Sequence, residues 1–419
     1  MPVRPVDPSS GIQAGADPAT PGTRTAEAAR PLTVAVLGAG HGGFATAADL
    51  ALRGHRVRLF ELPDFAENLR PVQEAGGIRL EVLPSFPRPG GFAPVERATQ
   101  RAAEALDGAD LAVLVVPAFA HARYVEEVVP HLKPGQALLL CPGYLGGVLF
   151  ARALQRRGVP LAGAPGPAGT VPPGEGVLVG EAESLIYAAR KVDPGTVWAR
   201  GYKRGLRMAA LPAPATPALM ELARRLYPDA EPASSLLETA LSHANALIHT
   251  ALMLLNAAHI ERTRGDFLFY HEGMTPAVGR LIELLDEERL AIGRAWGVPL
   301  RTLYQQDYGW YYHQGARGRT IYDTHVTNPI YAWSKAPGSL DHRYVTEDVP
   351  YGLVLLESLA RAAGVATPRI TAMIELWSGL LGRDFRAEGR TLERLGLGGL
   401  SVDQVRDVFL RTGALPGPG

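Results

Sequence analysis

One stretch of the chain carries polar side chains at a spacing that would place them on a single face of a helix. Within the apolar segment 235–262, five such residues recur at intervals of three, four or seven: Ser242, Asn245, His249, Asn256 and His259. In a helix these intervals align side chains along one face. A buried imidazole on that face can move protons near neutral pH, so we predict that His249 is an acid–base group and that Asn245 shares its site.

The same segment could instead be a core helix whose histidines are hydrogen-bonded for structure alone. Ser235 followed by Glu238 is typical of a capping box and predicts that the helix begins there. Two residues of a later polar segment could assist His249. Asp348 could orient and charge the imidazole, and Arg343 could bind a substrate carboxylate through two parallel hydrogen bonds. Each of these two could equally belong to a loop salt bridge, and their distance from His249 stays open.

A glycine-rich turn near the start of the chain suggests a second kind of chemistry. The apolar run Leu32–Leu37 is followed by GAGHGG at 38–43 and then by a segment of helical composition. A strand, a Gly-x-Gly-x-x-Gly turn and a helix in that order form the dinucleotide-binding fingerprint. Gly38 allows the tight turn, Gly40 lets the backbone approach a pyrophosphate, and Gly43 lets the helix pack close to the strand.

The next predicted strand ends at Glu61, where a carboxylate would bind both ribose hydroxyls of NAD and repel the phosphate of NADP. NAD(H) is therefore the expected cofactor, and neighbouring arginines keep NADP(H) as an alternative. Glu61 could also be an ordinary solvated charge at a strand end. Three more residues are expected beside the phosphates or the nicotinamide: His41, Gly42 and Pro117.

The order of elements predicts an α/β fold in which a doubly wound, Rossmann-type domain is followed by a mostly α-helical domain. We expect a disordered tail at 1–30, the dinucleotide-binding domain at 31–212, the helical substrate and catalytic domain at 213–410, and a loose C-terminus at 411–419. Residues 76–94 alternate and turn, which predicts a hairpin inserted in the sheet. Long helices are expected at 216–227, 235–262, 274–296, 351–363 and 369–381.

The composition points to small molecules as ligands. Lys plus Arg and Asp plus Glu both number 42, so the totals indicate neither nucleic acid nor a membrane surface as a partner. Cys141 is the only cysteine, which excludes an intrachain disulfide and fits the cytoplasm. No metal site is expected, because the histidine spacing does not suit zinc. A homodimer through the helical domain is plausible.

Several segments together resemble the NAD/NADP octopine/nopaline dehydrogenase family, the opine dehydrogenases. These are the glycine-rich front segment, the NALIH motif ending at His249, and the segments Gly265–Ile292, Ala336–Val354 and Gly382–Leu397. The resemblance implies NAD(P)H-dependent reductive condensation of a 2-keto acid with the amino group of an amino acid. It also implies that His249 transfers protons with Asp348 as its partner, and that Arg343 holds a carboxylate.

Two other interpretations stay open at this point. The protein could be a ketopantoate reductase-like enzyme or a 2-hydroxyacid dehydrogenase, which reduces a ketone without an amine. It could also be a nicotinamide sensor without catalytic activity, although burying Asn245 and His249 without a use would cost stability.

Overall fold

Six neighbouring strands of the main sheet run parallel, as the alternation of strands and helices predicts. The structure is a computed structural model that describes residues 30–416. In the main sheet the strand order is β14-β13-β10-β7-β6-β1-β2-β5, and only the pairing of β10 with β13 is antiparallel. The strands are β1 (Thr33–Leu37), β2 (Arg56–Phe60), β5 (Arg97–Thr99), β6 (Leu111–Leu114), β7 (Ala137–Leu140), β10 (Leu178–Ala182), β13 (Arg207–Leu211) and β14 (Glu231–Pro232).

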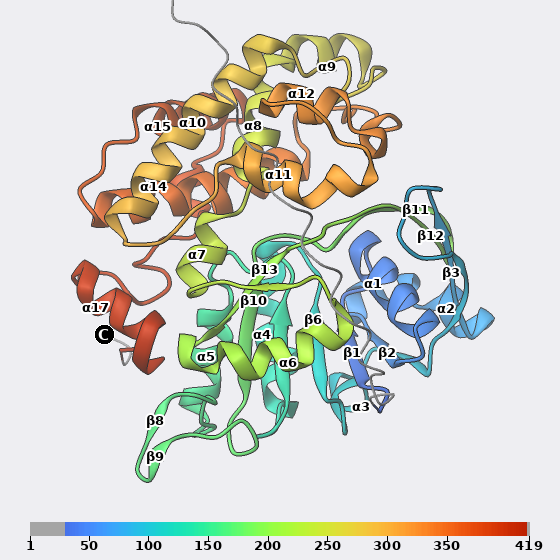
Figure 1. Cartoon of the computed structure of the whole chain (residues 1–419), viewed down its shortest axis with the longest axis vertical. Helices are drawn as coiled ribbons and strands as arrows, with labels where there is room; N and C mark the ends of the chain where they lie inside the picture. The colour runs from blue at the N-terminus through green and yellow to red at the C-terminus, as the bar shows by residue number, and fades with distance from the viewer. Residues whose placement is uncertain (1–29, 417–419) are drawn as a thin grey trace, which may run out of the picture. The chain divides into compact units, whose positions relative to one another are not determined.

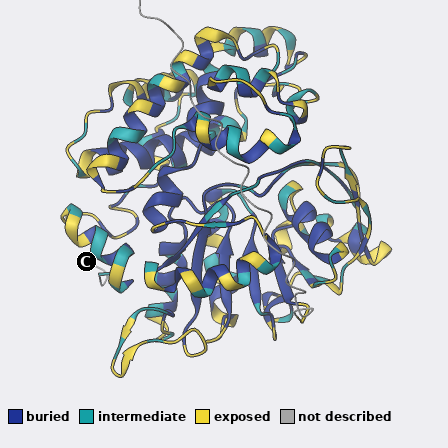
Figure 2. Ribbon diagram, in the orientation of Figure 1, coloured by how far each residue is buried: buried dark blue, intermediate teal, exposed yellow. Residues whose placement is uncertain are grey.

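The strand order changes direction between β1 and β6, which is the position where doubly wound folds bind their ligands. The side chains of β1, β6 and β7 are buried on both faces, as expected for strands between two layers of helices (Figure 2). The helices of this part are α1 (His41–Leu52), α2 (Arg70–Ala75), α3 (Ala102–Leu106), α4 (His121–Val128), α5 (Gly147–Arg156) and α6 (Thr216–Leu226). These observations confirm the predicted doubly wound α/β architecture.

The predicted hairpin at 76–94 exists, but its placement in the main sheet is wrong. Strands β3 (Gly77–Val82) and β4 (Gly91–Pro94) pair with each other and belong to a separate four-stranded sheet, β11-β12-β3-β4. Its other strands are β11 (Tyr187–Asp193) and β12 (Thr196–Tyr202). The sheet contacts α1, and Ile78 and Leu80 are buried there, so the hairpin covers the helix instead of extending the main sheet (Figure 1).

The predicted long helix at 235–262 is interrupted twice. The structure has α7 (Leu236–Leu241), α8 (Asn245–Leu255) and α9 (Ala257–Thr263), with breaks at 242–244 and at Asn256. The capping box is also wrong, because the Glu238 carboxylate accepts from the Ser234 N–H and pairs with Arg207, and the Ser235 hydroxyl makes no cap bond. The five polar residues therefore do not share one continuous helical face.

Most of the remaining helices pack around α8 and α10, whereas α17 packs on η8 apart from them (Figure 1). The remaining helices are α10 (Pro276–Ala295), α11 (Leu303–Tyr311), α12 (Ile321–Val326), α13 (Arg343–Thr346), α14 (Val354–Ala362), α15 (Pro368–Leu381), α16 (Phe385–Glu388) and α17 (Val402–Asp407), with π-helical turns η7 (Asp348–Leu353) and η8 (Val408–Thr412). Four predicted helices, at 216–227, 274–296, 351–363 and 369–381, correspond closely to α6, α10, α14 and α15.

Apart from Arg30, the expected tail lies outside the described residues, and so do the last three residues of the C-terminus. The main sheet continues to β14, beyond the expected change of character at residue 213, because β14 pairs with β13 and α6 packs on the same sheet. Within the described part of the chain, no helix is long and apolar enough to cross a membrane.

Candidate active site

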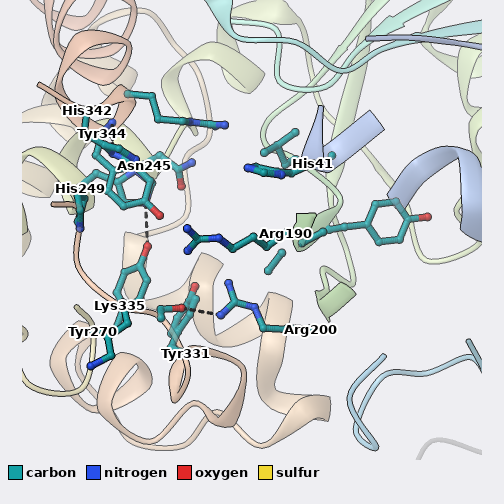
Figure 3. Close-up of a pocket in the computed structure, with 18 of the residues that line it drawn as sticks. His41, Arg190, Arg200, Asn245, His249, Tyr270, Tyr331, Lys335, His342 and Tyr344 are labelled. Carbon is teal, nitrogen blue, oxygen red and sulfur yellow. Dashed lines mark hydrogen bonds between the residues drawn. The ribbon is translucent and has the colours of Figure 1, made fainter. Parts of the chain in front are cut away.

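A cavity of about 380 Å³ lies between the glycine-rich turn and the helical part of the chain. His41 and Gly42 line it from the start of α1, while Asn245 and His249 line it from α8. Figure 3 shows these side chains converging on one space together with arginines from β11 and β12. Three of the predicted catalytic residues therefore line the same cavity, since Arg343 also does.

Both nitrogens of the buried His249 ring are hydrogen-bonded. Nδ1 lies 2.7 Å from Oδ2 of Asp348, and Nε2 lies 2.9 Å from the hydroxyl of Tyr270. The ring also stacks on Tyr344, with ring centroids 3.8 Å apart. Asp348 thus has the position that the sequence predicted for a partner of the imidazole.

Close packing of η7 on α8 brings Asp348 to His249. Gly352 lies opposite Ala246, and a Cβ atom at position 352 would overlap the Ala246 side chain. Glycine at this position therefore lets the two segments approach, and Asp348 at the start of η7 then faces the middle of α8. The helix and the acidic segment are far apart in the sequence, so only the fold reveals the pair.

The environment of His249 keeps the imidazole neutral. Burial lowers the pKa of His249 below its ordinary value of 6.5, although the hydrogen bond and charge of Asp348 act in the opposite direction. Burial raises the pKa of Asp348, but its hydrogen bond to His249 and the charges of neighbouring groups, Arg343 among them, together outweigh this effect, and the pKa lies below its ordinary value. The ring therefore carries its proton on Nδ1, toward the carboxylate, and Nε2 accepts from the Tyr270 hydroxyl.

Tyr144 connects this pair to the main sheet. Its hydroxyl donates to Oδ1 of Asp348 at 3.0 Å, and its ring lies 3.7 Å from that of His243. Tyr144 and Leu145 have φ values of 52° and 59°, so the chain turns sharply between β7 and α5. The sequence analysis did not identify Tyr144, although the glycine-rich PGYLGG segment that contains it marks a turn.

Arg343 lines the cavity but contacts a different carboxylate from the one bound to His249. Its Nε lies 3.6 Å from Glu347, and the Glu347 carboxylate accepts from the backbone N–H of Ala118 at 3.0 Å. Ala118 follows Pro117, which lies at the carboxyl edge of β6 as predicted but does not line the cavity. Glu347, which the sequence analysis missed, therefore links the arginine to the sheet edge.

The glycine turn fits a pyrophosphate. Gly38 has a φ of 105°, which favours glycine, and a Cβ atom at Gly43 would overlap the Gly38 carbonyl oxygen. Nothing lies within 4 Å of the place where a Cβ atom of Gly40 would be, so a ligand can approach the backbone there. No side chain caps the first turn of α1 at Gly40. Its free N–H groups therefore suit an anion.

Two other predicted cofactor residues make contacts within the protein. The buried Glu61 carboxylate accepts from the backbone N–H groups of Ala39 and Leu62 and from the hydroxyl of Tyr124. Its role toward a ribose stays a prediction. His41 accepts from the Lys191 N–H through Nδ1, and burial, followed by the charges of nearby arginines, lowers its pKa to about 4.

Other polar residues of the segment 235–262 do not line the cavity. Asn256 donates to the carbonyls of Leu252 and Gly273 at the break between α8 and α9, and His259 packs against Phe267. The side chains that the sequence analysis missed come mainly from strands and aromatic loops. Those lining the cavity include Arg190, Arg200, Tyr270, Tyr331 and Tyr344.

The chain is similar to known proteins along most of its length. Residues 232–381 match the family model "NAD/NADP octopine/nopaline dehydrogenase, alpha-helical domain", and residues 33–142 match "NAD-dependent glycerol-3-phosphate dehydrogenase N-terminus". The opine dehydrogenase of Arthrobacter sp. (strain 1C) is 36% identical over 89% of this chain and 98% of its own length.

Two solved structures share the fold. One is octopine dehydrogenase with NADH and L-arginine, with a TM-score of 0.69, 22% identity and coverage of 93% of this chain and all of that one. The other is NADP⁺-bound yersinopine dehydrogenase, with a TM-score of 0.60, 17% identity and coverage of 90% and 97%. Together with the 36% identity to the Arthrobacter enzyme, these matches confirm the predicted resemblance: the chain belongs to the NAD/NADP octopine/nopaline dehydrogenase family and is an NAD(P)-dependent oxidoreductase of the opine dehydrogenase type.

Proposed function

We propose that this protein catalyses the NAD(P)H-dependent reductive condensation of a 2-keto acid with the amino group of an amino acid. The observation that carries the proposal is the hydrogen-bonded pair of His249 and Asp348, which opens onto a cavity beside a dinucleotide-binding turn. A neutral imidazole at this position can accept a proton from an incoming ammonium group. The cavity also has room for two small substrates next to each other.

The residues that would hold the cofactor are those of the turn and the neighbouring strand ends. Gly38, Gly40, Gly42 and Gly43 let the backbone and the first turn of α1 contact the pyrophosphate, and Glu61 lies at the strand end where a ribose is usually bound. The reduced nicotinamide, when bound, supplies the hydride. His41, which lines the cavity, and Pro117, at the carboxyl edge of the sheet, are the residues that would flank its ring.

His249 handles the protons of the condensation. Nε2 accepts a proton from the substrate ammonium after the amine has replaced Tyr270 as its partner, and Asp348 stabilises the imidazolium that forms. The free amine then attacks the keto carbon to give a carbinolamine. His249 returns the proton to the carbinolamine hydroxyl, which leaves as water, and the protonated imine that results would accept the hydride.

Arg343 and Asn245 position the substrates in this scheme. The guanidinium of Arg343 binds a substrate carboxylate, and Asn245, one helical turn before His249 and also at the cavity, can hydrogen-bond the reacting oxygen. We further propose that the reaction takes place in the cytoplasm, which fits the single, buried Cys141. A homodimer through the helical part is our expectation for the assembly.

A screen of keto acids crossed with amino acids tests the proposal. NADH oxidation that requires both substrates, with the N-(carboxyalkyl) amino acid identified by mass spectrometry, is the expected result. Oxidation that ignores the amine would favour the ketopantoate reductase-like or 2-hydroxyacid dehydrogenase alternative. Tight NADH binding without turnover of any pair would favour the sensor. Repeating the screen with NADPH compares the two cofactors.

A further inference from the structure

The cavity beside His249 is rich in positive charge and is lined by no carboxylate. Among the described residues that line it, none is Asp or Glu, and five carry an ammonium or guanidinium group: Arg190, Arg200, Lys203, Lys335 and Arg343. A buried positive charge without a counter-ion costs free energy. A cavity built in this way therefore favours ligands that carry several negative charges.

Three of these five cations already interact with protein carboxylates. The Lys335 ammonium lies 2.7 Å from Asp266, outside the cavity, and Arg343 lies 3.6 Å from Glu347. Lys203 is buried over the ring of Trp310, and its ammonium donates to the Ser184 hydroxyl at 2.6 Å. Burial lowers the pKa of Lys203 to about 8, while Asp307 and Glu183 act against this shift.

Arg200 differs from these three because no carboxylate balances it. It projects from β12, and among the described residues its side chain donates one hydrogen bond, to the Ser334 hydroxyl at 3.0 Å. Its Nε is buried without a partner, and none of the groups that act most strongly on its charge is a carboxylate. Burial lowers the pKa of Arg200, but a guanidinium keeps its charge. In Figure 3 the group extends into the cavity between Tyr331 and Arg190.

The substrates of the proposed reaction bring two carboxylates, one on the keto acid and one on the amino acid. In the proposed scheme we assign Arg343 and Arg190 to the reacting end, because both line the cavity and their charges, together with that of Lys191, act after burial to lower the pKa of His41 beside the glycine turn. After burial, the charges of both arginines also lower the pKa of His342, near His249. These two arginines suffice for the two carboxylates that flank the new C–N bond.

Arg200 lies among aromatic side chains, away from the glycine turn. The phenol groups of Tyr344, Tyr270 and Tyr311 raise the pKa of Arg200 and so act against the effect of burial. Tyr270 is the residue bonded to Nε2 of His249, so this part of the cavity begins where the amine binds in the proposed mechanism. The side chain of the amino acid substrate therefore extends toward Arg200.

We propose that the amine substrate carries a second carboxylate, as glutamate and aspartate do, and that Arg200 is the residue that selects for it. This inference rests on the proposed function. A neutral side chain would leave the half-buried guanidinium without a charged partner, and a cationic side chain such as that of arginine would be repelled by it. Lys203, in the same cavity, adds to the positive potential that attracts the second carboxylate.

The test compares amino acids of equal size and different charge at one keto acid concentration. For wild-type enzyme with pyruvate and NADH, we expect kcat/KM for glutamate to exceed that for glutamine by about 100-fold or more, and aspartate to exceed asparagine likewise. Equal values for the acids and their amides would overturn this inference alone. The absence of any amine-dependent turnover would overturn the proposed function as well.

A second arm decides which substrate supplies the extra carboxylate. Alanine with 2-oxoglutarate, a dicarboxylic keto acid, is compared with glutamate and pyruvate. Higher kcat/KM for glutamate with pyruvate supports the assignment to the amine. Higher kcat/KM for alanine with 2-oxoglutarate overturns it.

A substitution then assigns the preference to Arg200. Arg200→Gln keeps a hydrogen-bonding group near Ser334, and it should lower the ratio of kcat/KM for glutamate to that for glutamine by about 10- to 100-fold. Arg79→Gln is the matched control, because Arg79 is an exposed arginine on β3 of the same sheet, outside the cavity. It should keep the wild-type ratio. An unchanged ratio in Arg200→Gln would overturn the role of Arg200.

Discussion

The Nδ1 atom of His249 lies 2.7 Å from Oδ2 of Asp348, although 99 positions separate the two residues in the chain. The other oxygen of the same carboxylate accepts from Tyr144, so one side chain joins α8, η7 and the turn after β7. This arrangement fixes the tautomer of the imidazole and directs Nε2 to the cavity. Proton transfer can then begin without a change of ring orientation.

Replacing His249 tests its role as the acid–base group. His249→Ala should retain NADH binding, because the turn at Gly38–Gly43 is untouched, and should lower kcat by about 10²–10⁴-fold. Steady-state kinetics and a fluorescence titration with NADH measure the two effects. His259→Ala is the matched control. Because His259 lies outside the cavity, this substitution should change neither kcat nor NADH binding. Near-normal turnover of His249→Ala would discard the assignment.

Replacing Asp348 by its amide tests whether the carboxylate orients and charges the ring. Asp348→Asn keeps the size of the side chain but presents an uncharged group to Nδ1, so the imidazolium loses its stabilising charge. We expect kcat to fall by about 10²–10⁴-fold with little change in KM. A change in KM alone would indicate that Asp348 acts in substrate binding.

The pH dependence of kcat/KM should report His249. The ring must be neutral to accept a proton, and burial lowers its pKa, so activity should fall only as the pH decreases below the ordinary value of 6.5. The charge of Arg343 also lowers this pKa. Arg343→Gln should therefore move the acidic limb of the pH profile to higher pH. A limb that stays in place in this variant would show that another group controls it.

The glycine turn offers a test of cofactor binding that leaves the catalytic pair intact. In Gly43→Ala the new methyl group would overlap the Gly38 carbonyl, and a backbone shift of this kind costs roughly 1–3 kcal/mol. We expect the dissociation constant for NADH to rise by about one to two orders of magnitude. Gly379→Ala, in α15, is the control, because the space around that position is open. Unchanged NADH binding in Gly43→Ala would contradict the proposed pyrophosphate site.

His243 should make the folded protein sensitive to acid. Its ring is buried against Tyr144, neither nitrogen has a partner among the described residues, and burial lowers its pKa from 6.5 to about 3. Between these pH values the unfolded chain binds a proton that the folded protein excludes, so the free energy of unfolding decreases as the pH falls.

The variant His243→Phe keeps the contact between the rings and removes the titrating group. Its free energy of unfolding should depend less steeply on pH between 6.5 and 3, by up to about 1.4 kcal/mol per pH unit. Urea unfolding at several pH values measures the slope. An unaltered slope in His243→Phe would contradict the assignment.

Local patterns were enough to predict the elements of the proposed cofactor site. The strand, turn and helix around Gly38–Gly43 are contiguous, so their spacing in the sequence carries the geometry. The breaks at 242–244 and Asn256 were not predictable from apolar content, because the flanking residues are equally apolar on both sides. Arg200 and Tyr144 were missed because strands and turns far away in the chain bring them to the site, which no local pattern records.

The hairpin formed by β11 and β12 supplies Arg190 and Arg200, whereas the proton-handling pair comes from α8 and η7. Under the proposals above, recognition of the amine and the chemical step therefore reside on separate segments that are held in place by different neighbours. Exchanging a few residues of the hairpin could give enzymes with new amine preferences and the same reaction. Such grafts offer a route to tailored chiral secondary amines from one scaffold.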